Sequence, residues 1–341
     1  MTPGRISERR PEVSREELIS ALVPPPKFAH ARFDNYLPDP AEPTQIEALA
    51  NLRDFADAIT LKRGWFNRKV DGRRGRYLDG GFGVGKTHLL SALWFEVDAP
   101  KAFGTFVEFT NLVGVLGFAQ TVESLAKFKL LCIDEFELDD PGDTVLMSTL
   151  LMRLVERGVW LGATSNTLPD RLGEERFAAE DFVREIQGLA AHFDNLRVDG
   201  EDYRHRGLPA APPPASSQAI AFALDHLPPG LGELNATLDG FADLTHALAQ
   251  LHPSRYRALV RGVDVVGITD VETITDQAAA LRWVVLADRL YDQETPLLTS
   301  GVPLDQLFAP DLLKGGYRKK YRRAISRLVA LSREGQRLLH G

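Results

Sequence analysis

The chain has 341 residues, of which 44% are hydrophobic and 26% are charged, and its formal net charge is −7 at pH 7. The length favours two domains or one elaborated domain of a globular protein, and the acidic balance argues against a general nucleic-acid binder. The single cysteine, Cys132, excludes an intrachain disulfide and fits a reducing compartment. No apolar run approaches the ~20 residues of a membrane span, so we expect a cytoplasmic protein.

The first part of the sequence predicts a lead-in followed by a helix. Residues 1–27 carry many charges and end in three prolines, which is typical of a flexible segment. Acidic residues within it argue against a mitochondrial transit peptide. Apolar residues at helical spacing over residues 44–62 predict the first long helix.

Short apolar runs then alternate with longer segments that suit helices. The predicted strands are residues 76–78, 105–109, 130–133, 159–163 and 195–198. Runs of this kind are typical of strands that are buried on both faces of a sheet. The order predicts an α/β domain with a mainly parallel sheet over residues 28–208.

A proline-rich stretch at residues 209–218 predicts a linker to a second region. Residues 219–341 are predicted to form a C-terminal α/β region. Its predicted strands are residues 219–224, 263–268 and 296–299, and its predicted helices lie near residues 281–291 and 317–333. The last of these helices is rich in lysine and arginine, which we interpret as a solvated face or a surface for a protein partner.

A phosphate-binding loop follows the first predicted strand and matches the complete pattern G-x-x-x-x-G-K-[ST]. Together with the residue after it, the loop supplies the predicted nucleotide-binding residues, which are Gly80, Gly81, Phe82, Gly83, Val84, Gly85, Lys86, Thr87 and His88. The glycines let backbone N–H groups turn inward around phosphates. Lys86 can reach the β- and γ-phosphates, and the Thr87 hydroxyl can bind Mg²⁺. The loop therefore predicts a bound nucleotide together with Mg²⁺.

The strand at residues 130–133 runs directly into two acids. We expect Asp134 to hold Mg²⁺ through water, and Glu135 to activate the water that attacks the γ-phosphate. A polar residue after the next strand can reach the γ-phosphate or that water, and we assign this role to Asn166, with Thr164 as the second choice. With Lys86, the predicted catalytic residues are Glu135 and Asn166, which favours a hydrolase over a passive nucleotide binder.

The order of strand, phosphate loop, intervening strand, acid pair and polar sensor resembles the AAA+ branch of P-loop ATPases. More specific stretches are D-Y-R-x-R at residues 202–206 and Y-R-R-x-x-S-R-L at residues 321–328. Through these pieces, residues 30–333 resemble the ZapE family of cell-division ATPases, whose mitochondrial relatives are the lactation-elevated-type ATPases. The resemblance implies a Mg²⁺-dependent ATPase, and it implies that the segment from Phe33 to Tyr36 lies near the adenine.

The same resemblance implies the partners. Bacterial members of the family act on the division ring and destabilise FtsZ polymers, so the expected partner is FtsZ or another divisome protein. We further expect an ATP-dependent homo-oligomer, no stable complex with nucleic acid, and only peripheral membrane association through partners.

One stretch departs from the family pattern. Related sequences carry arginines in a Q-R-x-R-F stretch after the sensor strand, whereas residues 177–182 contain none. An arginine finger from a neighbouring subunit would stabilise the transition state, and Arg176 and Arg184 are the candidates for it. Arg171 is interpreted as a surface residue.

Residues 268–307 echo residues 133–172 in sequence. At a constant offset Asp134 matches Asp270, and Val271 stands where Glu135 is. After one gap the match continues, and Gly301 stands where Asn166 is. The echo is explained either by a decayed repeat that lost its chemistry or by chance identities between two similar α/β units.

Two other functions share some of these features. A DNA-associated ATPase of the helicase-loader or initiator type would have the same loop and acid pair, but the acidic net charge and the lack of a basic DNA-binding module argue against it. A non-enzymatic adaptor that uses nucleotide to order its surface would not need Glu135.

Overall fold

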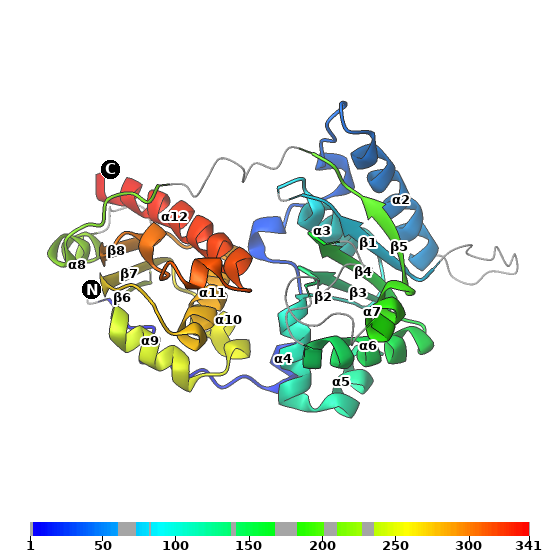
Figure 1. The fold of residues 1–341 in the computed structure, drawn as a ribbon, viewed down its shortest axis with the longest axis horizontal. Coiled ribbons are helices and arrows are strands. Elements are labelled where there is room, and N and C mark those ends of the chain that lie inside the picture. The colour runs from blue at the N-terminus through cyan, green and yellow to red at the C-terminus, as the bar shows by residue number, and fades with distance from the viewer. Residues whose placement is uncertain are drawn as a thin grey trace, which may run out of the picture. The chain divides into compact units, whose positions relative to one another are not determined.

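The computed structural model describes residues 3–60, 73–81, 83–137, 141–167, 183–200, 210–226 and 235–340. The chain divides into two compact units, which are shown in Figure 1. The larger unit is Ser14–His205, and the smaller unit combines Met1–Val13 with Arg206–Gly341. Each unit is described by itself below. No helix among the described residues has the length and apolar character that crossing a membrane requires.

The larger unit is an α/β domain. Its described helices are α1 (Arg15–Ser20), α2 (Pro43–Thr60), α3 (Lys86–Glu96), α4 (Phe106–Leu116), α5 (Phe118–Leu125), α6 (Pro141–Glu156) and α7 (Val183–Ala190), with 3-10 turns η1 (Pro26–Phe28) and η2 (Phe33–Asn35). Its strands are β1 (Gly75–Asp79), β2 (Lys101–Thr105), β3 (Leu130–Asp134), β4 (Trp160–Ser165) and β5 (Phe193–Arg197). The strands form one sheet in the order β2-β3-β4-β1-β5, and all neighbours are parallel. The predicted mainly parallel α/β fold is confirmed.

Alternate residues of the strands pack on opposite faces of this sheet, as strand geometry requires. Leu130 and Cys132 of β3 pack with α2 and α3 on one face. Leu131 and Ile133 pack with α4, α5 and α6 on the other. Both faces are therefore covered, which explains why the strands read as continuous apolar runs in the sequence.

The smaller unit has a second, smaller parallel sheet. Its helices are α8 (Ser217–Asp225), α9 (Phe241–Gln250), α10 (Tyr256–Leu259), α11 (Gln277–Asp292) and α12 (Arg318–His340), with 3-10 turns η6 (Pro253–Arg255), η7 (Leu304–Gln306) and η8 (Leu312–Lys314). Its strands are β6 (Ala236–Gly240), β7 (Val265–Val271) and β8 (Leu297–Gly301), in the order β6-β7-β8.

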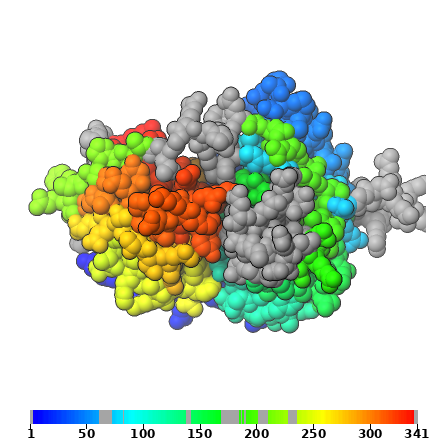
Figure 2. All heavy atoms as spheres, viewed as in Figure 1, coloured from blue at the N-terminus to red at the C-terminus, as the bar shows by residue number. Residues whose placement is uncertain are grey.

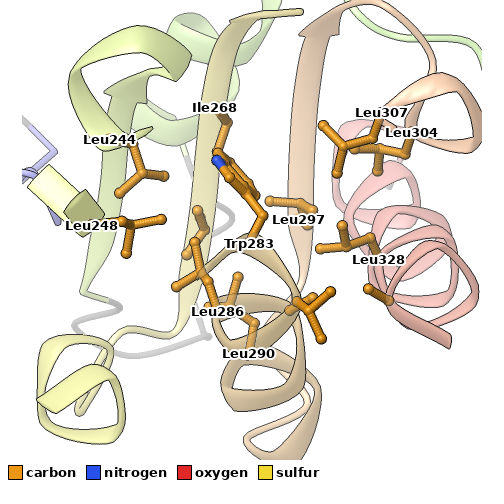
Figure 3. Close-up of a cluster of buried hydrophobic side chains, with 14 of the residues drawn as sticks. Leu244, Leu248, Ile268, Trp283, Leu286, Leu290, Leu297, Leu304, Leu307 and Leu328 are labelled. Carbon is orange, nitrogen blue, oxygen red and sulfur yellow. The ribbon is translucent and has the colours of Figure 1, made fainter. Parts of the chain in front are cut away.

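Helices cover both faces of the smaller sheet. Figure 3 shows the main core, in which leucines of α9, α11 and α12 surround Ile268 of β7 and Trp283 of α11. On the opposite face α8 packs through Ile220 and Leu224. Gly267 permits this contact, because a Cβ there would lie 2.8 Å from Leu224 Cδ1. In the space-filling view α8 projects from the unit as lime-green atoms (Figure 2).

The N-terminal segment differs from the predicted flexible lead-in. Gly4 forms a parallel bridge with Thr237 of β6, and the side chain of Asp239 accepts hydrogen bonds from the N–H groups of Ile6 and Ser7, both at 2.8 Å. Ile6 is fully buried in the core of the smaller unit. Residues farther along form α1, and Leu22 is buried in the larger unit, where its carbonyl oxygen accepts from β2. These apolar side chains and edge hydrogen bonds hold the segment in place.

Two predicted strands are wrong. Residues 105–109 begin α4, because Thr105 and Glu108 form a capping box that starts a helix there, and β2 ends at Thr105. Residues 219–224 lie in α8, whose N-cap is Ser216. Residues 219–224 alternate small and large apolar side chains, which imitates the period of a strand, but the helix buries Ile220 and Leu224 at a spacing of four.

The smaller sheet repeats the arrangement of β2, β3 and β4. In both units a strand runs directly into a helix, a short helical segment follows, and a 16-residue helix then joins the second strand to the third. The registers agree, because Lys101 pairs with Leu130 where Ala236 pairs with Val265, an offset of 135 on both strands. The structural equivalence is therefore wider than the predicted echo of residues 133–172.

The repeat extends to an unusual backbone conformation. Glu135 and Asp270 both have positive φ, at 52° and 57°. The N–H of Glu135 donates to Thr164 Oγ1 at 3.1 Å, and that of Asp270 donates to Ser300 Oγ at 2.9 Å. Asp270 thus stands in the place of Glu135. The predicted pairing of Asp270 with Asp134 is one residue out of step. At the offset of 135 Asp134 corresponds to Thr269, and seven residues separate Thr269 from α11 whereas six separate Asp134 from α6.

Part of the basic character of α12 is used inside the smaller unit. Arg323 Nη2 lies 3.0 Å from Asp288 Oδ2, and Arg327 pairs with Asp288 Oδ1. Burial alone would raise the pKa of Asp288, but the two guanidinium groups outweigh it and lower the pKa below its usual value. The exposed basic side chains in this part of the helix include Lys319 and Arg322.

Candidate functional site

The candidate site lies at the carboxyl edge of the five-stranded sheet. The phosphate-binding loop follows β1, the acid pair ends β3, and Asn166 follows β4. Strand β4 lies between β1 and β3. Its polar end is therefore one strand spacing, about 4.8 Å, from the end of β1, where the loop begins, and the same distance from the end of β3, where the acids lie. The structure thus brings together side chains that lie far apart in the sequence.

The phosphate-binding loop needs glycine at two positions for lack of space. Gly85 has φ of 92°, and a Cβ there would lie 2.6 Å from Tyr36 Cε2. At Gly80 a Cβ would collide with the carbonyl oxygen of Val198. Helix α3 then begins at Lys86, so its N-terminal N–H groups and dipole face an anion in the loop. Phe82 lies outside the described residues.

Lys86 is almost fully buried at the start of α3, with 8% of its surface exposed. Its Nζ donates to the carbonyl oxygens of Gly80, at 2.9 Å, and Gly81, and to Asn166 Oδ1 at 3.0 Å. These three acceptors are neutral, whereas a phosphate oxygen would give the ammonium group a stronger, charge-assisted bond. The position therefore favours an anion over the loop.

Thr87 and Asp134 fit a magnesium ion. The Thr87 hydroxyl donates to Asp134 Oδ1 and Oδ2 at 3.1 and 3.2 Å, and the carboxylate is buried. A hydroxyl and a carboxylate are the hard oxygen ligands that Mg²⁺ takes, together with water and nucleotide phosphates. The two predicted metal residues are thus adjacent and of the right chemistry.

Thr164 connects the two acids of the pair. Its hydroxyl donates to Asp134 Oδ1 and accepts the backbone N–H of Glu135. Glu135 is held in the left-handed conformation by this contact, and Phe136 N–H then donates to the carbonyl oxygen of Thr164 at 2.7 Å. A single hydroxyl thus positions the metal ligand and the backbone of the candidate base.

The aromatic segment before α2 lies against the loop. Tyr36 OH donates to the carbonyl oxygen of Val84 at 3.1 Å, and burial raises the pKa of Tyr36 to about 12, so the hydroxyl stays a donor. His88 contacts the same segment through Arg32, whose carbonyl oxygen lies 3.1 Å from His88 Nε2. Phe33 is a core residue at 3% exposure. Proximity of this segment to an adenine stays a prediction.

The arginine candidates are only partly within the described residues. Arg184 lies on α7 with its side chain exposed to solvent. Arg171, Arg176 and the stretches at residues 177–182 and 202–206 lie outside the described residues. The assignment of a finger therefore stays a prediction.

Sequence reasoning missed an acid and an ion pair at this edge. Glu137 is buried, and its Oε1 accepts from Asn166 Nδ2 at 3.2 Å. The only sequence signal for it was a third acid two residues after Glu135. Asp79, at the end of β1, is 1% exposed and lies 2.6 Å from Arg197 of β5. This pair and hydrogen bonds to Asp79 raise the pKa of Arg197. Such a pair across two strands leaves no sequence pattern.

Comparison with known proteins places these features in a family. A family model described as AFG1-like ATPase matches residues 12–227 and 231–337. Among curated relatives, the cell division protein ZapE of Escherichia coli (strain K12) is 30% identical over 300 residues, covering 76% of this chain and 78% of that protein. The ZapE of Escherichia coli O157:H7 gives the same values.

Solved structures give weaker likenesses. AMPPCP-bound DnaA from Aquifex aeolicus has a TM-score of 0.39 and 13% identity, covering 49% of this chain and 50% of that one. The crystal structure of DnaI has a TM-score of 0.38 and 18% identity, covering 52% of this chain and 98% of that one.

Proposed function

Because the chain belongs to the AFG1-like ATPase family, we propose that it hydrolyses ATP in a Mg²⁺-dependent reaction and uses the energy to remodel a protein partner in cell division. The observation that carries the proposal is that one edge of the sheet holds two hydrogen-bonded pairs, Lys86 with Asn166 and Thr87 with Asp134. Thr164 links Asp134 to the backbone of Glu135 at the same edge. These side chains support the proposed roles in phosphate binding, metal binding and sensing.

In the proposed reaction each residue of the site has a separate role. The loop N–H groups and Lys86 would bind the phosphate chain. Thr87 and Asp134 would hold the Mg²⁺, which would neutralise charge on the phosphate oxygens. Glu135 accepts the proton of the attacking water. Its backbone is held by the hydrogen bond to Thr164. Asn166 contacts Lys86 and is placed to respond to the γ-phosphate.

The test separates binding from turnover. We expect Lys86→Ala to abolish tight ATP binding, because the buried ammonium contact is lost. We expect Glu135→Gln to keep binding and to lower kcat by roughly 10²–10⁴-fold, because water activation is lost. Fluorescent-nucleotide binding and phosphate release measure the two effects. Near-normal hydrolysis by Glu135→Gln would overturn the assignment of the base.

The partner is proposed from the relative. ZapE is named a cell division protein, and we propose that this chain acts in the cytoplasm on FtsZ or another divisome protein. A pull-down with Glu135→Gln, which should hold both ATP and its partner, tests this. Stimulation of hydrolysis by single-stranded DNA, without any effect of a division protein, would instead favour a DNA-associated ATPase.

Assembly is proposed through an arginine finger. Arg184 is exposed on α7 and Arg176 is the second candidate. Specific activity should rise with protein concentration, because a finger comes from a neighbouring subunit. A flat dependence, with full activity of both the Arg184→Ala and Arg176→Ala variants, would remove the finger from the proposal.

A further inference from the structure

Three side chains form a continuous hydrogen-bonded chain from the phosphate loop to an acid that the proposed mechanism does not use. Lys86 Nζ donates to Asn166 Oδ1 at 3.0 Å, and Asn166 Nδ2 donates to Glu137 Oε1 at 3.2 Å. Glu137 is 8% exposed. A buried carboxylate needs hydrogen-bond donors, and the Asn166 amide supplies one to Glu137.

The chemistry of the two outer groups fixes the orientation of the amide between them. An ammonium group can only donate hydrogen bonds, and an ionised carboxylate can only accept them. If the carboxamide of Asn166 were turned over, its NH₂ would face Lys86 and its oxygen would face Glu137, and both contacts would be repulsive. Glu137 therefore selects the orientation in which Asn166 presents its oxygen to Lys86.

We propose that Glu137 is a positioning residue for ATP hydrolysis, which holds the carboxamide of Asn166 in the orientation that meets Lys86. This inference rests on the proposed ATPase function. Glu137 acts through Asn166 and needs no contact with nucleotide. Lys86 keeps its two bonds to loop carbonyl oxygens when Asn166 turns, so loss of Glu137 affects turnover more than nucleotide binding.

The smaller unit provides an internal comparison. At the offset of 135 that relates β3 to β7, the position of Glu137 is taken by Glu272. Strand β8 lies at an offset of 136 from β4, because Leu131 pairs with Leu161 where Val266 pairs with Leu297, so the position of Asn166 is taken by Val302. Val302 packs against the core and has no amide, and Glu272 is exposed to solvent. The fold therefore does not require the acid at this position to be buried, because Glu272 is exposed. The acid is buried in the larger unit, where Asn166 follows the next strand.

The experiment measures kcat and KM for ATP in the full-length chain carrying Glu137→Ala, Glu137→Gln, Asn166→Asp or the last two together. A hydrogen bond to a charged group corresponds to roughly tenfold or more in rate, so we expect Glu137→Ala to lower kcat about tenfold with KM changed less than about threefold. Glu137→Gln still accepts through its oxygen and should keep most of the turnover. The matched control, Glu272→Ala, should have the wild-type kcat.

The double variant gives the sharpest outcome. Asn166→Asp places a second carboxylate beside that of Glu137, and the repulsion between them should lower turnover. Glu137→Gln supplies a donor to that aspartate and should restore about tenfold of the loss. Wild-type kcat in Glu137→Ala, or no restoration in the double variant, would overturn the role of Glu137. If Glu137→Ala does not fold, the double variant decides alone. Absence of hydrolysis in the wild type would instead overturn the proposed ATPase function.

Discussion

Thr164→Val should separate the packing of the site from its polar contacts. Valine has nearly the shape of threonine, and position 164 is only 2% exposed, so the substitution removes a hydroxyl without opening a cavity. The lost contacts are the donation to Asp134 and the acceptance of the N–H of Glu135. We therefore expect that removal of the Thr164 hydroxyl alone lowers both the free energy of unfolding and kcat.

The magnitude follows from these two contacts. A hydrogen bond to a charged group contributes about 1.5–3 kcal/mol and a neutral one about 1 kcal/mol, so the larger unit should lose about 2–4 kcal/mol. Glu135 also loses the contact that fixes its left-handed backbone, a conformation that costs of order 1 kcal/mol or more for a non-glycine residue. Relaxation of that backbone would move the carboxylate, and kcat should fall by at least about tenfold.

The assay uses the repeat as its control. Ser300→Ala removes the equivalent contact to the N–H of Asp270 and the contact to Ser217 in the smaller unit. Hydrogen exchange resolved by peptide should show faster opening of β3 and β4 in Thr164→Val, and of β7 and β8 in Ser300→Ala. Only the first variant should lose ATPase activity, and Thr164→Ser should retain it. Wild-type kcat and exchange in Thr164→Val would refute the reasoning.

Three further predictions concern other parts of the chain. Asp288→Asn leaves two partly buried guanidinium groups without their carboxylate and should destabilise the smaller unit by about 3 kcal/mol in urea unfolding. An unchanged midpoint would contradict this. Burial lowers the pKa of His192, although Glu156 opposes the shift, so the unfolded chain takes up the proton at a higher pH than the folded chain and stability should decline as the pH falls below ~6.5. His192→Gln should make this decline less steep in a pH series of melting temperatures. An equally steep decline in the variant would show that His192 is not its cause. Charge reversal at Lys319 and Arg322 should weaken co-sedimentation with FtsZ, with the difference shrinking as salt rises, and salt-independent binding equal to wild type would show that α12 is not the contact.

Local chemistry explains which parts of the site the sequence could predict. The loop and the acid pair depend on residues that are close in sequence, and the structure positions Lys86, Thr87 and Asp134 as their spacing indicates. The start of α4 was also encoded locally, in the capping box of Thr105 and Glu108, but the apolar run across it was interpreted as a strand.

Other features depend on tertiary partners and could not be read in this way. The role proposed for Glu137 depends on Asn166, which β4 brings within hydrogen-bond distance and which lies 29 residues later in the sequence. The burial of Ile6 requires a strand that lies 233 residues later in the sequence, as the hydrogen bond to Asp239 shows. The charges of the first residues are typical of a flexible segment, and nothing local distinguishes a segment that later pairs with a distant sheet edge.

The pairing of residues 4–7 with β6 has a consequence for biosynthesis. The segment is synthesised well before its partner strand, because Asp239, which accepts the N–H groups of Ile6 and Ser7, is made 233 residues after Ile6. At 5–20 residues per second this interval lasts roughly 10–50 s. During that time the larger unit can complete its sheet, while the first residues wait without a partner. Their many charges keep them soluble in the interval, and a bulky fusion placed before them would be present at the moment when the last sheet edge closes.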